Sequence, residues 1–195
     1  MKAIQTIRDE HRSISAVLHA LKQLARDAQN ARVKPDFAVF RAMLHYIDQF
    51  PEQLHHPKED AYLFPPLLAQ RPQMQVLLDS LRAEHKQGEK LVRELERAVM
   101  LFEDSWPAGG ADFRALVDAY ADFHWQHMGK EEKQVLPAAE RYLSARDWEA
   151  IDWAFDAHND PIAGVKEHDF QTLFSRIVNL APAPVGFAEP WKKTA

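Results

Sequence analysis

Histidine and glutamate side chains recur at helical spacing along this chain of 195 residues. His55 and Glu59 are four residues apart, as are His127 and Glu131, and this spacing places two side chains on the same face of a helix. Imidazole suits iron, zinc and copper, and carboxylates also bind metal ions. The two pairs therefore indicate metal binding, provided that they face the protein interior rather than form exposed ion pairs.

An internal repeat relates the polar residues of the two halves. The segment 8–12 resembles the segment 82–86, 74 positions later, and the segment 55–60 resembles the segment 127–132, 72 positions later. His11 and His85, at equivalent places in the repeat, each interrupt an apolar stripe of helical period. A duplicated helix pair explains the match. Recurrence of both histidines favours a shared role over two unrelated buried side chains.

Inward-facing carboxylates strengthen this interpretation. His127 and Glu131 continue a stripe formed by Phe113, Val117 and Tyr120. Burying a carboxylate costs several kcal/mol unless it is paired or coordinates a metal ion. The pattern predicts a two-metal site whose ligands lie at one depth of a helical bundle: His11, His55, Glu59, His85, His127 and Glu131.

Long stretches without helix breakers must position these residues. Apolar residues at alternating spacings of three and four predict helices over 2–29, 36–69, 73–103 and 111–143. Short connections make consecutive helices antiparallel neighbours. We therefore expect an all-α protein with an up-down-up-down four-helix bundle.

The chain beyond the bundle has a different pattern. Apolar residues within 147–180 predict two short helices, separated at 159–161, and three prolines in 181–195 predict an extended tail. We divide the chain into a bundle over 1–143 and a helical appendage with its tail over 144–195, packed on the bundle.

Composition excludes several classes of protein. The 24 Lys and Arg against 29 Asp and Glu give a net charge of −5, which is unlike a non-specific nucleic-acid binder. Cysteine is absent, so disulfides and thiolate metal sites are excluded. The sequence has neither an apolar signal segment nor a run long enough for a membrane span. We expect a cytoplasmic protein without nucleic-acid or membrane partners.

Several segments together resemble the hemerythrin-like, or HHE cation-binding, family. They are Asp9-Glu10-His11, the run from His55 to Pro65, Glu84-His85, and the run from His127 to Glu132 with Pro137. The resemblance covers about residues 1–143 and implies a non-haem di-iron centre. It also implies that Glu59 and Glu131 bridge both irons, with His11, His55, His85 and His127 as terminal ligands. Spacing alone leaves another divalent metal open.

The chain departs from its oxygen-carrying relatives at one position. Those proteins have a fifth histidine one turn beyond the position of His85, where this chain has Glu89. Glu89 either completes the shell of the second iron or is an exposed helix residue. Relatives that repair iron–sulfur clusters usually carry an N-terminal cysteine segment, which is absent here. Reversible dioxygen carriage and cluster repair are therefore both weakened.

Residues beside the six ligands have open roles. His124, one turn before His127, is a ligand, a partner of a ligand or a core residue, and we favour the last two. His56 faces another helix or water. Gly88 leaves room for a small ligand or for an aromatic ring, and Tyr120 donates a hydrogen bond or simply packs.

Pro57 and Gly129 are equivalent positions, two residues after a predicted histidine ligand. Proline lacks an N–H group and glycine lacks conformational restraint, so both weaken a helix. We expect local distortion of both ligand helices at the metals.

Two classes of function compete. The first is binding of a small diatomic molecule or peroxide at the di-iron pair, or sensing of oxygen, nitric oxide or iron supply. The second is an enzyme or protective protein that consumes peroxide or supplies iron for cluster repair. A purely structural metal site is a third interpretation. Catalytic turnover and assembly into a homodimer are both left open by the sequence.

Overall fold

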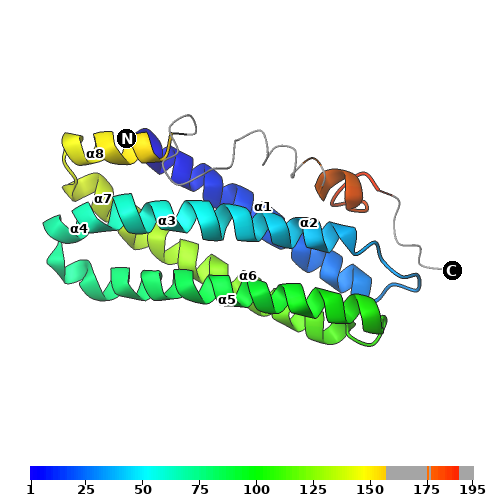
Figure 1. Ribbon diagram of the computed structural model, residues 1–195. Helices are drawn as coiled ribbons and strands as arrows, with labels where there is room; N and C mark the ends of the chain where they lie inside the picture. The colour runs from blue at the N-terminus through cyan, green and yellow to red at the C-terminus, as the bar shows by residue number, and fades with distance from the viewer. Residues whose placement is uncertain (157–174, 176, 189–195) are drawn as a thin grey trace.

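The computed structural model describes residues 1–156, 175 and 177–188, and the described helices form four long rods (Figure 1). The first rod is α1 (Lys2–Gln29), and the second comprises α2 (Ala38–Ile47), η1 (Asp48–His55), α3 (His56–Lys58), η2 (Glu59–Leu63) and α4 (Phe64–Gln70). The third comprises η3 (Pro72–Met74) and α5 (Gln75–Ser105), and the fourth comprises α6 (Gly110–Lys130), η4 (Glu131–Val135) and α7 (Leu136–Tyr142).

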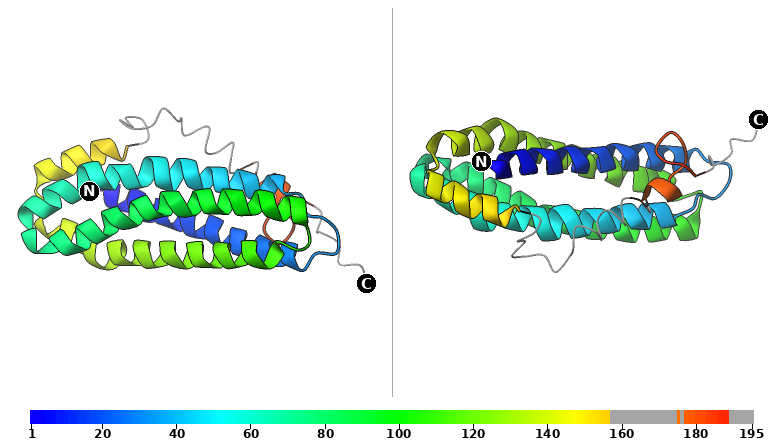
Figure 2. Two further views of the ribbon diagram at one scale, coloured as in Figure 1. Left: turned by 60° about the horizontal axis from the view of Figure 1, so that its bottom comes forward. Right: turned by 90° about the horizontal axis from the view of Figure 1, so that it is seen from above.

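The rods form an up-down-up-down four-helix bundle, as Figure 2 shows from two further sides. Helix α1 packs against α2 and α6, and α5 also packs against α2 and α6. The four rods therefore close into a ring around a common interior. The predicted fold class is confirmed, and each predicted helix agrees with the observed rod to within two residues. None of the described helices is long and apolar enough to cross a membrane.

Buried apolar side chains form two clusters on either side of a polar layer. One cluster contains Ile7 and Leu81, and the other contains Ile14 and Val92. On α1, His11 lies between Ile7 and Ile14. The polar layer thus interrupts a core that is apolar at both ends of the bundle.

Helical geometry changes at three places in the second and fourth rods. The segments η1, η2 and η4 are π-helical turns. A proline within a helix cannot donate its backbone hydrogen bond, and its ring crowds the carbonyl four residues earlier. Pro57, Pro65 and Pro137 each follow such a π-turn, and the crowded carbonyls lie inside them. These carbonyls belong to Gln53, Ala61 and Lys133.

The expected distortion of both ligand helices is present, but its cause differs from the expectation at one position. Gly129 lies within regular α-helix, and α6 continues to Lys130. The π-turns begin at Glu59 and Glu131 instead. The distortion therefore follows the repeated prolines, Pro65 and Pro137, and Gly129 does not produce it.

Helix α8 (Ala145–Ala154) starts the C-terminal segment, where the first of the two short helices was expected. Ser144 and Asp147 form a reciprocal cap at its N-terminus, and Trp148 and Ile151 pack into the cluster that contains Ile7. Most of the second expected helix lies outside the described residues. Of the expected tail, residues 181–188 fold back through turns, and 189–195 lie outside the described residues.

Candidate metal centre

All six predicted ligands lie together in the polar layer, at most 5% exposed. They form two overlapping groups that share Glu59 and Glu131, and in each group the nitrogen and oxygen atoms suited to metal binding lie within 4.8 Å of one another. The first group adds His11 and His55, and the second adds His85 and His127. Their assignment as metal ligands is part of the function proposed below.

Each central carboxylate faces both histidine pairs. Glu131 Oε2 lies 3.4 Å from His11 Nε2, while its Oε1 lies 3.3 Å from His127 Nε2. Glu59 is placed in the same way between the other two histidines, with its two oxygens 3.5 and 3.7 Å from their Nε2 atoms. One oxygen toward each pair is the placement that a carboxylate needs to bridge two ions.

The Nδ1 atom of each of these four histidines faces a further carboxylate on a neighbouring rod. Three of these contacts are hydrogen bonds: His11 Nδ1 to Glu132 at 3.1 Å, His55 Nδ1 to Glu10 at 2.8 Å and His127 Nδ1 to Glu84 at 3.1 Å. The fourth contact is an ion pair in which His85 Nδ1 lies 3.1 Å from Asp60 Oδ2. Such partners fix the orientation and tautomer of a metal-binding imidazole.

These contacts determine where the imidazole protons lie. An ionised carboxylate only accepts hydrogen bonds, so the Nδ1 atom facing it carries the proton and the neutral ring keeps a lone pair on Nε2. His11 Nε2 lies 3.1 Å from His55 Nε2, and His85 Nε2 lies 3.2 Å from His127 Nε2. Facing lone pairs at these distances repel, so either a proton shared between the two nitrogens or a metal ion bound by both must compensate each pair.

The carboxylate oxygens of Glu59 and Glu131 also lack partners within the protein. Neither oxygen of Glu59 or Glu131 accepts a hydrogen bond, although both side chains are buried. An ionised carboxylate in that state is strongly unfavourable unless a positive charge compensates it. Four inward lone pairs and four unpartnered oxygens therefore fit a pair of metal ions.

Comparison with known families agrees with this geometry. The model of the hemerythrin HHE cation-binding domain matches residues 2–139, a span that contains all six residues. The chain belongs to the hemerythrin HHE cation-binding family. A search of curated proteins finds no match.

Charge is unevenly divided within this HHE domain. Burial raises the pKa of Glu59, and the neighbouring Glu131 carboxylate raises it further. Burial acts in the same direction on Glu131, but the facing histidines, His127 foremost, outweigh it and hold its pKa well below the usual range. Burial lowers the pKa of His127, but Glu131 and Glu84 outweigh burial and raise it to about 9. Without metal, protons on Glu59 and His127 are thus favoured, and metal ions displace such protons when they bind.

A second buried polar group, here called the Glu52 cluster, consists of Glu52, His56, Tyr120 and His124. Tyr120 donates a hydrogen bond to Glu52 Oε1 at 3.0 Å, and His56 Nδ1 lies 3.2 Å from Oε2. His124 Nε2 lies 3.2 Å from Oε1. Burial raises the pKa of Glu52, but His124 and His56 outweigh it and hold the pKa below its usual range. Glu52 is therefore a fully partnered buried carboxylate.

Gly88 makes room for this cluster rather than for an exogenous ligand or an aromatic ring. A Cβ atom at position 88 would lie 2.7 Å from Glu52 Oε1. Tyr120 donates a hydrogen bond, which settles the alternative left open by the sequence. His124 contacts Glu52 and belongs to neither ligand group, as the favoured interpretation expected.

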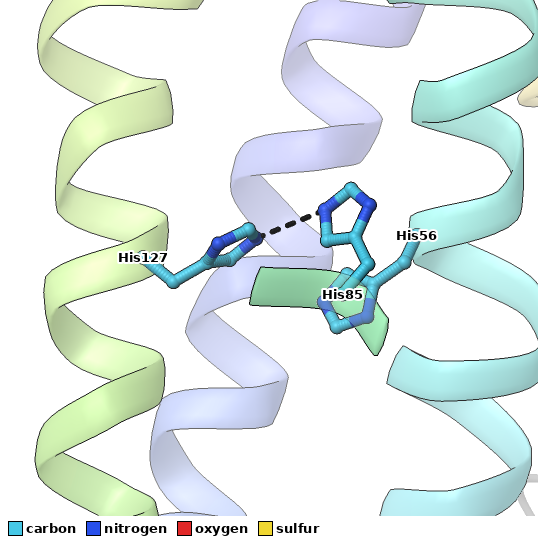
Figure 3. A group of neighbouring side chains, drawn as sticks. All are labelled: His56, His85 and His127. Atoms are coloured by element: carbon cyan, nitrogen blue, oxygen red, sulfur yellow. Dashed lines mark hydrogen bonds between the residues drawn. The ribbon is translucent and has the colours of Figure 1, made fainter. Parts of the chain in front are cut away.

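His56 also approaches the HHE centre, because one of its nitrogens lies within 4.8 Å of nitrogens of His85 and His127 (Figure 3). The rings of His56 and His85 are stacked, however, with centroids 4.3 Å apart and planes inclined by 8°. Nitrogen lone pairs lie in the ring planes, and nearly parallel planes do not converge on one ion. In this arrangement His56 supports the ring of His85 and does not share an ion with it.

The remaining candidates lie away from the centre. Glu89 is exposed on α5 and belongs to none of the ligand groups, which favours the exposed-residue alternative. His19 and His45 are exposed, and His158 and His168 lie outside the described residues.

A cavity of about 500 Å³ borders the HHE centre on the outer side of His11. Its lining includes the apolar side chains of Trp125 and Met128 together with Ser15, Gly129 and Glu132. His11 is the member of the six that lines this cavity. A small solute in this cavity, between α1 and α6, would lie against His11.

Proposed function

We propose that the polar layer holds two iron ions and that the protein binds a small ligand, dioxygen, nitric oxide or peroxide, or senses oxygen or iron. The observation that carries this proposal is the convergence of four histidine Nε2 atoms and four unpartnered carboxylate oxygens in one buried layer. Glu59 and Glu131 would bridge the ions, with His11 and His55 on one and His85 and His127 on the other.

The protein residues shape what such a centre can do. Bound iron would supply redox chemistry and open coordination positions for a small ligand. The two apolar clusters limit the access of water from both ends of the bundle. Because Glu89 is exposed, no side chain at that position replaces the fifth histidine of oxygen carriers. We therefore propose that the protein does not store dioxygen reversibly.

Metal analysis tests the proposal directly. The full chain is treated with chelator, reconstituted anaerobically with ferrous iron, freed of excess metal and analysed for elements. We expect about two irons per chain and an optical change when oxygen is added. Argon should not restore the starting spectrum. A limit of one ion per chain, or zinc that iron cannot displace, would overturn the di-iron assignment, and repeated reversible oxygenation would restore the carrier role.

The second candidate, consumption of peroxide, has one structural feature in its favour. Reduction of peroxide to water requires protons and electrons. The hydrogen-bonded group of Tyr120, Glu52 and His56 holds exchangeable protons beside the centre, where a nitrogen of His56 lies within 4.8 Å of nitrogens of His85 and His127. Steady-state assays of the iron-loaded protein with peroxide and a reductant separate the two candidates. Rapid multiple turnover favours the protective enzyme, and a single slow oxidation favours the binding or sensing role.

A further inference from the structure

The four outer carboxylates form a closed circuit around the bundle. Glu10 on the first rod contacts His55 on the second, and Asp60 on the second contacts His85 on the third. The circuit continues from the third rod to the fourth and from the fourth back to the first. Its last two contacts join Glu84 to His127 and Glu132 to His11.

The circuit follows the internal repeat. Each outer carboxylate is the immediate sequence neighbour of a predicted ligand, since Glu10 and Glu84 precede His11 and His85. Asp60 and Glu132 follow the two bridging glutamates in the same way. Each carboxylate nevertheless contacts a histidine of the next rod, not the ligand beside it in sequence. Each pair of adjacent residues, such as Glu10 and His11, thus supplies one predicted ligand and one carboxylate that supports a predicted ligand on another rod.

We propose that Glu10, Asp60, Glu84 and Glu132 are positioning residues that set the metal affinity and the reduction potential of the centre. This inference rests on the proposed function and deepens it. Each carboxylate holds the proton on Nδ1 and directs the Nε2 lone pair inward, which makes the imidazole a stronger ligand. The circuit also raises the number of carboxylates around the layer from two to six. Negative charge at this distance favours the more positive oxidation state of a bound metal.

The contributions differ with solvent exposure and with nearby cations. The side chains of Glu10 and Glu84 are each 17% exposed, whereas those of Asp60 and Glu132 are 35% and 45% exposed. Solvent screens exposed charges more strongly. Lys130 pairs with Glu84 and offsets part of its charge. The effect should therefore be largest at Glu10 and Glu84 and smaller at Glu132.

The tautomer is measured without any metal. Long-range ¹H–¹⁵N NMR spectra of the chelator-treated full chain report which ring nitrogen carries the proton. We expect a proton on Nδ1 of His11, His55 and His127, all of which form hydrogen bonds to a carboxylate. The Nε2–H form at these residues would overturn the proposed role of the circuit, whatever the protein binds.

Isosteric variants test affinity and potential. Glu10→Gln and Glu84→Gln keep the shape and an oxygen acceptor but remove the charge, and Glu89→Gln is the matched control at an exposed position. Anaerobic competition for ferrous iron with a chromogenic chelator should give 10–100-fold weaker binding for the first two variants, with about two ions still bound at saturation. Their midpoint potentials should rise, and Glu132→Gln should show a smaller change in both quantities.

The controls distinguish a failure of the proposed role of the circuit from a failure of the proposed function. If Glu10→Gln, Glu84→Gln and Glu89→Gln all match the unmodified protein in affinity and potential, the circuit has no positioning role. If the unmodified protein binds no ferrous iron, the proposed function fails, and the NMR measurement still decides the role of the circuit. If either variant in the circuit loses its helical circular dichroism, Glu132→Gln, which replaces the most exposed member, supplies the same comparison.

Discussion

Two buried groups in this bundle contain the same kinds of residue but differ in their hydrogen bonds. In the Glu52 cluster, Tyr120 and His56 donate to Glu52, and His124 lies against it. In the polar layer, the oxygens of Glu59 and Glu131 accept no hydrogen bond. Residue type and burial are therefore alike in the two groups, and the supply of donors distinguishes them.

This difference shows how a protein can mark one buried carboxylate for structure and another for metal binding. A carboxylate with hydrogen-bond donors is compensated within the protein, whereas one without donors requires an external cation. The histidines follow the same rule. His56 directs Nδ1 to the Glu52 carboxylate within its own cluster, whereas the four histidines of the layer bind outer carboxylates and turn their Nε2 atoms inward.

The largest expected effect is loss of metal from the layer. Glu59→Ala and Glu131→Ala should each reduce bound iron from about two ions per chain to less than one, because each carboxylate faces both histidine pairs. Elemental analysis after anaerobic reconstitution measures this. Glu89→Ala, at an exposed position on α5, is the control and should keep full metal content. A full complement of iron in either bridge variant would show that the carboxylate is not a ligand.

The next effect is on the melting temperature. Removing metal should lower it, and replacing Glu59 should raise it in the metal-free protein alone. Without metal, the interior must hold Glu59 in its protonated form and balance Glu131 only against the facing histidines, at a cost of several kcal/mol, so the melting temperature should fall by many degrees. Glu59→Met replaces one carboxylate by an apolar side chain of similar volume. It should therefore melt above the chelated unmodified protein but gain nothing from added iron. Equal melting temperatures with and without chelator would show that the layer does not require a cation.

The sequence predicted the helices and the inward residues because both follow from a regular pattern. Spacings of three and four placed the rods, and the repeat paired His11 with His85. The Glu52 cluster has a weaker pattern. Glu52 has no equivalent glutamate, since the residue 72 positions later is His124. Only the fold shows that these two equivalent positions lie in contact, 3.2 Å apart.

The outer carboxylates were missed for a different reason. Glu10 and Glu84 recur in the repeat, but their spacing from His55 and His127 depends on how the rods pack. No local period relates side chains on two different helices. A recurrent acidic residue beside four of the six predicted ligands was the available indication in the sequence. A predicted ligand set with two carboxylates therefore leaves out the charge of the four carboxylates that surround it.

A smaller effect is expected from the partnered carboxylate. Glu52→Met leaves Tyr120 and the Nδ1–H of His56 without an acceptor, and each buried unsatisfied group costs about 1–3 kcal/mol. The variant should lose about 2–6 kcal/mol of unfolding free energy with metal and with chelator alike, while still binding about two irons. Denaturant unfolding in both states measures the loss. A loss confined to the iron-loaded state would place Glu52 in the metal centre and remove the contrast between the two groups.

The smallest effect compares two glycines within helices. A Cβ at Gly88 would lie 2.7 and 2.8 Å from the two oxygens of Glu52, whereas a Cβ at Gly129 meets no atom within 4 Å. Alanine stabilises an open helical position by about 0.5–1 kcal/mol relative to glycine. Gly129→Ala should therefore gain about that amount. Gly88→Ala has the same helical gain but must displace the Glu52 carboxylate from its donors, and overpacking of this kind costs about 1–3 kcal/mol. Denaturant midpoints should consequently move in opposite directions for the two variants. A gain at both positions would mean that Glu52 moves aside freely, and the Glu52 cluster would then not be the rigid, satisfied group that distinguishes it from the polar layer.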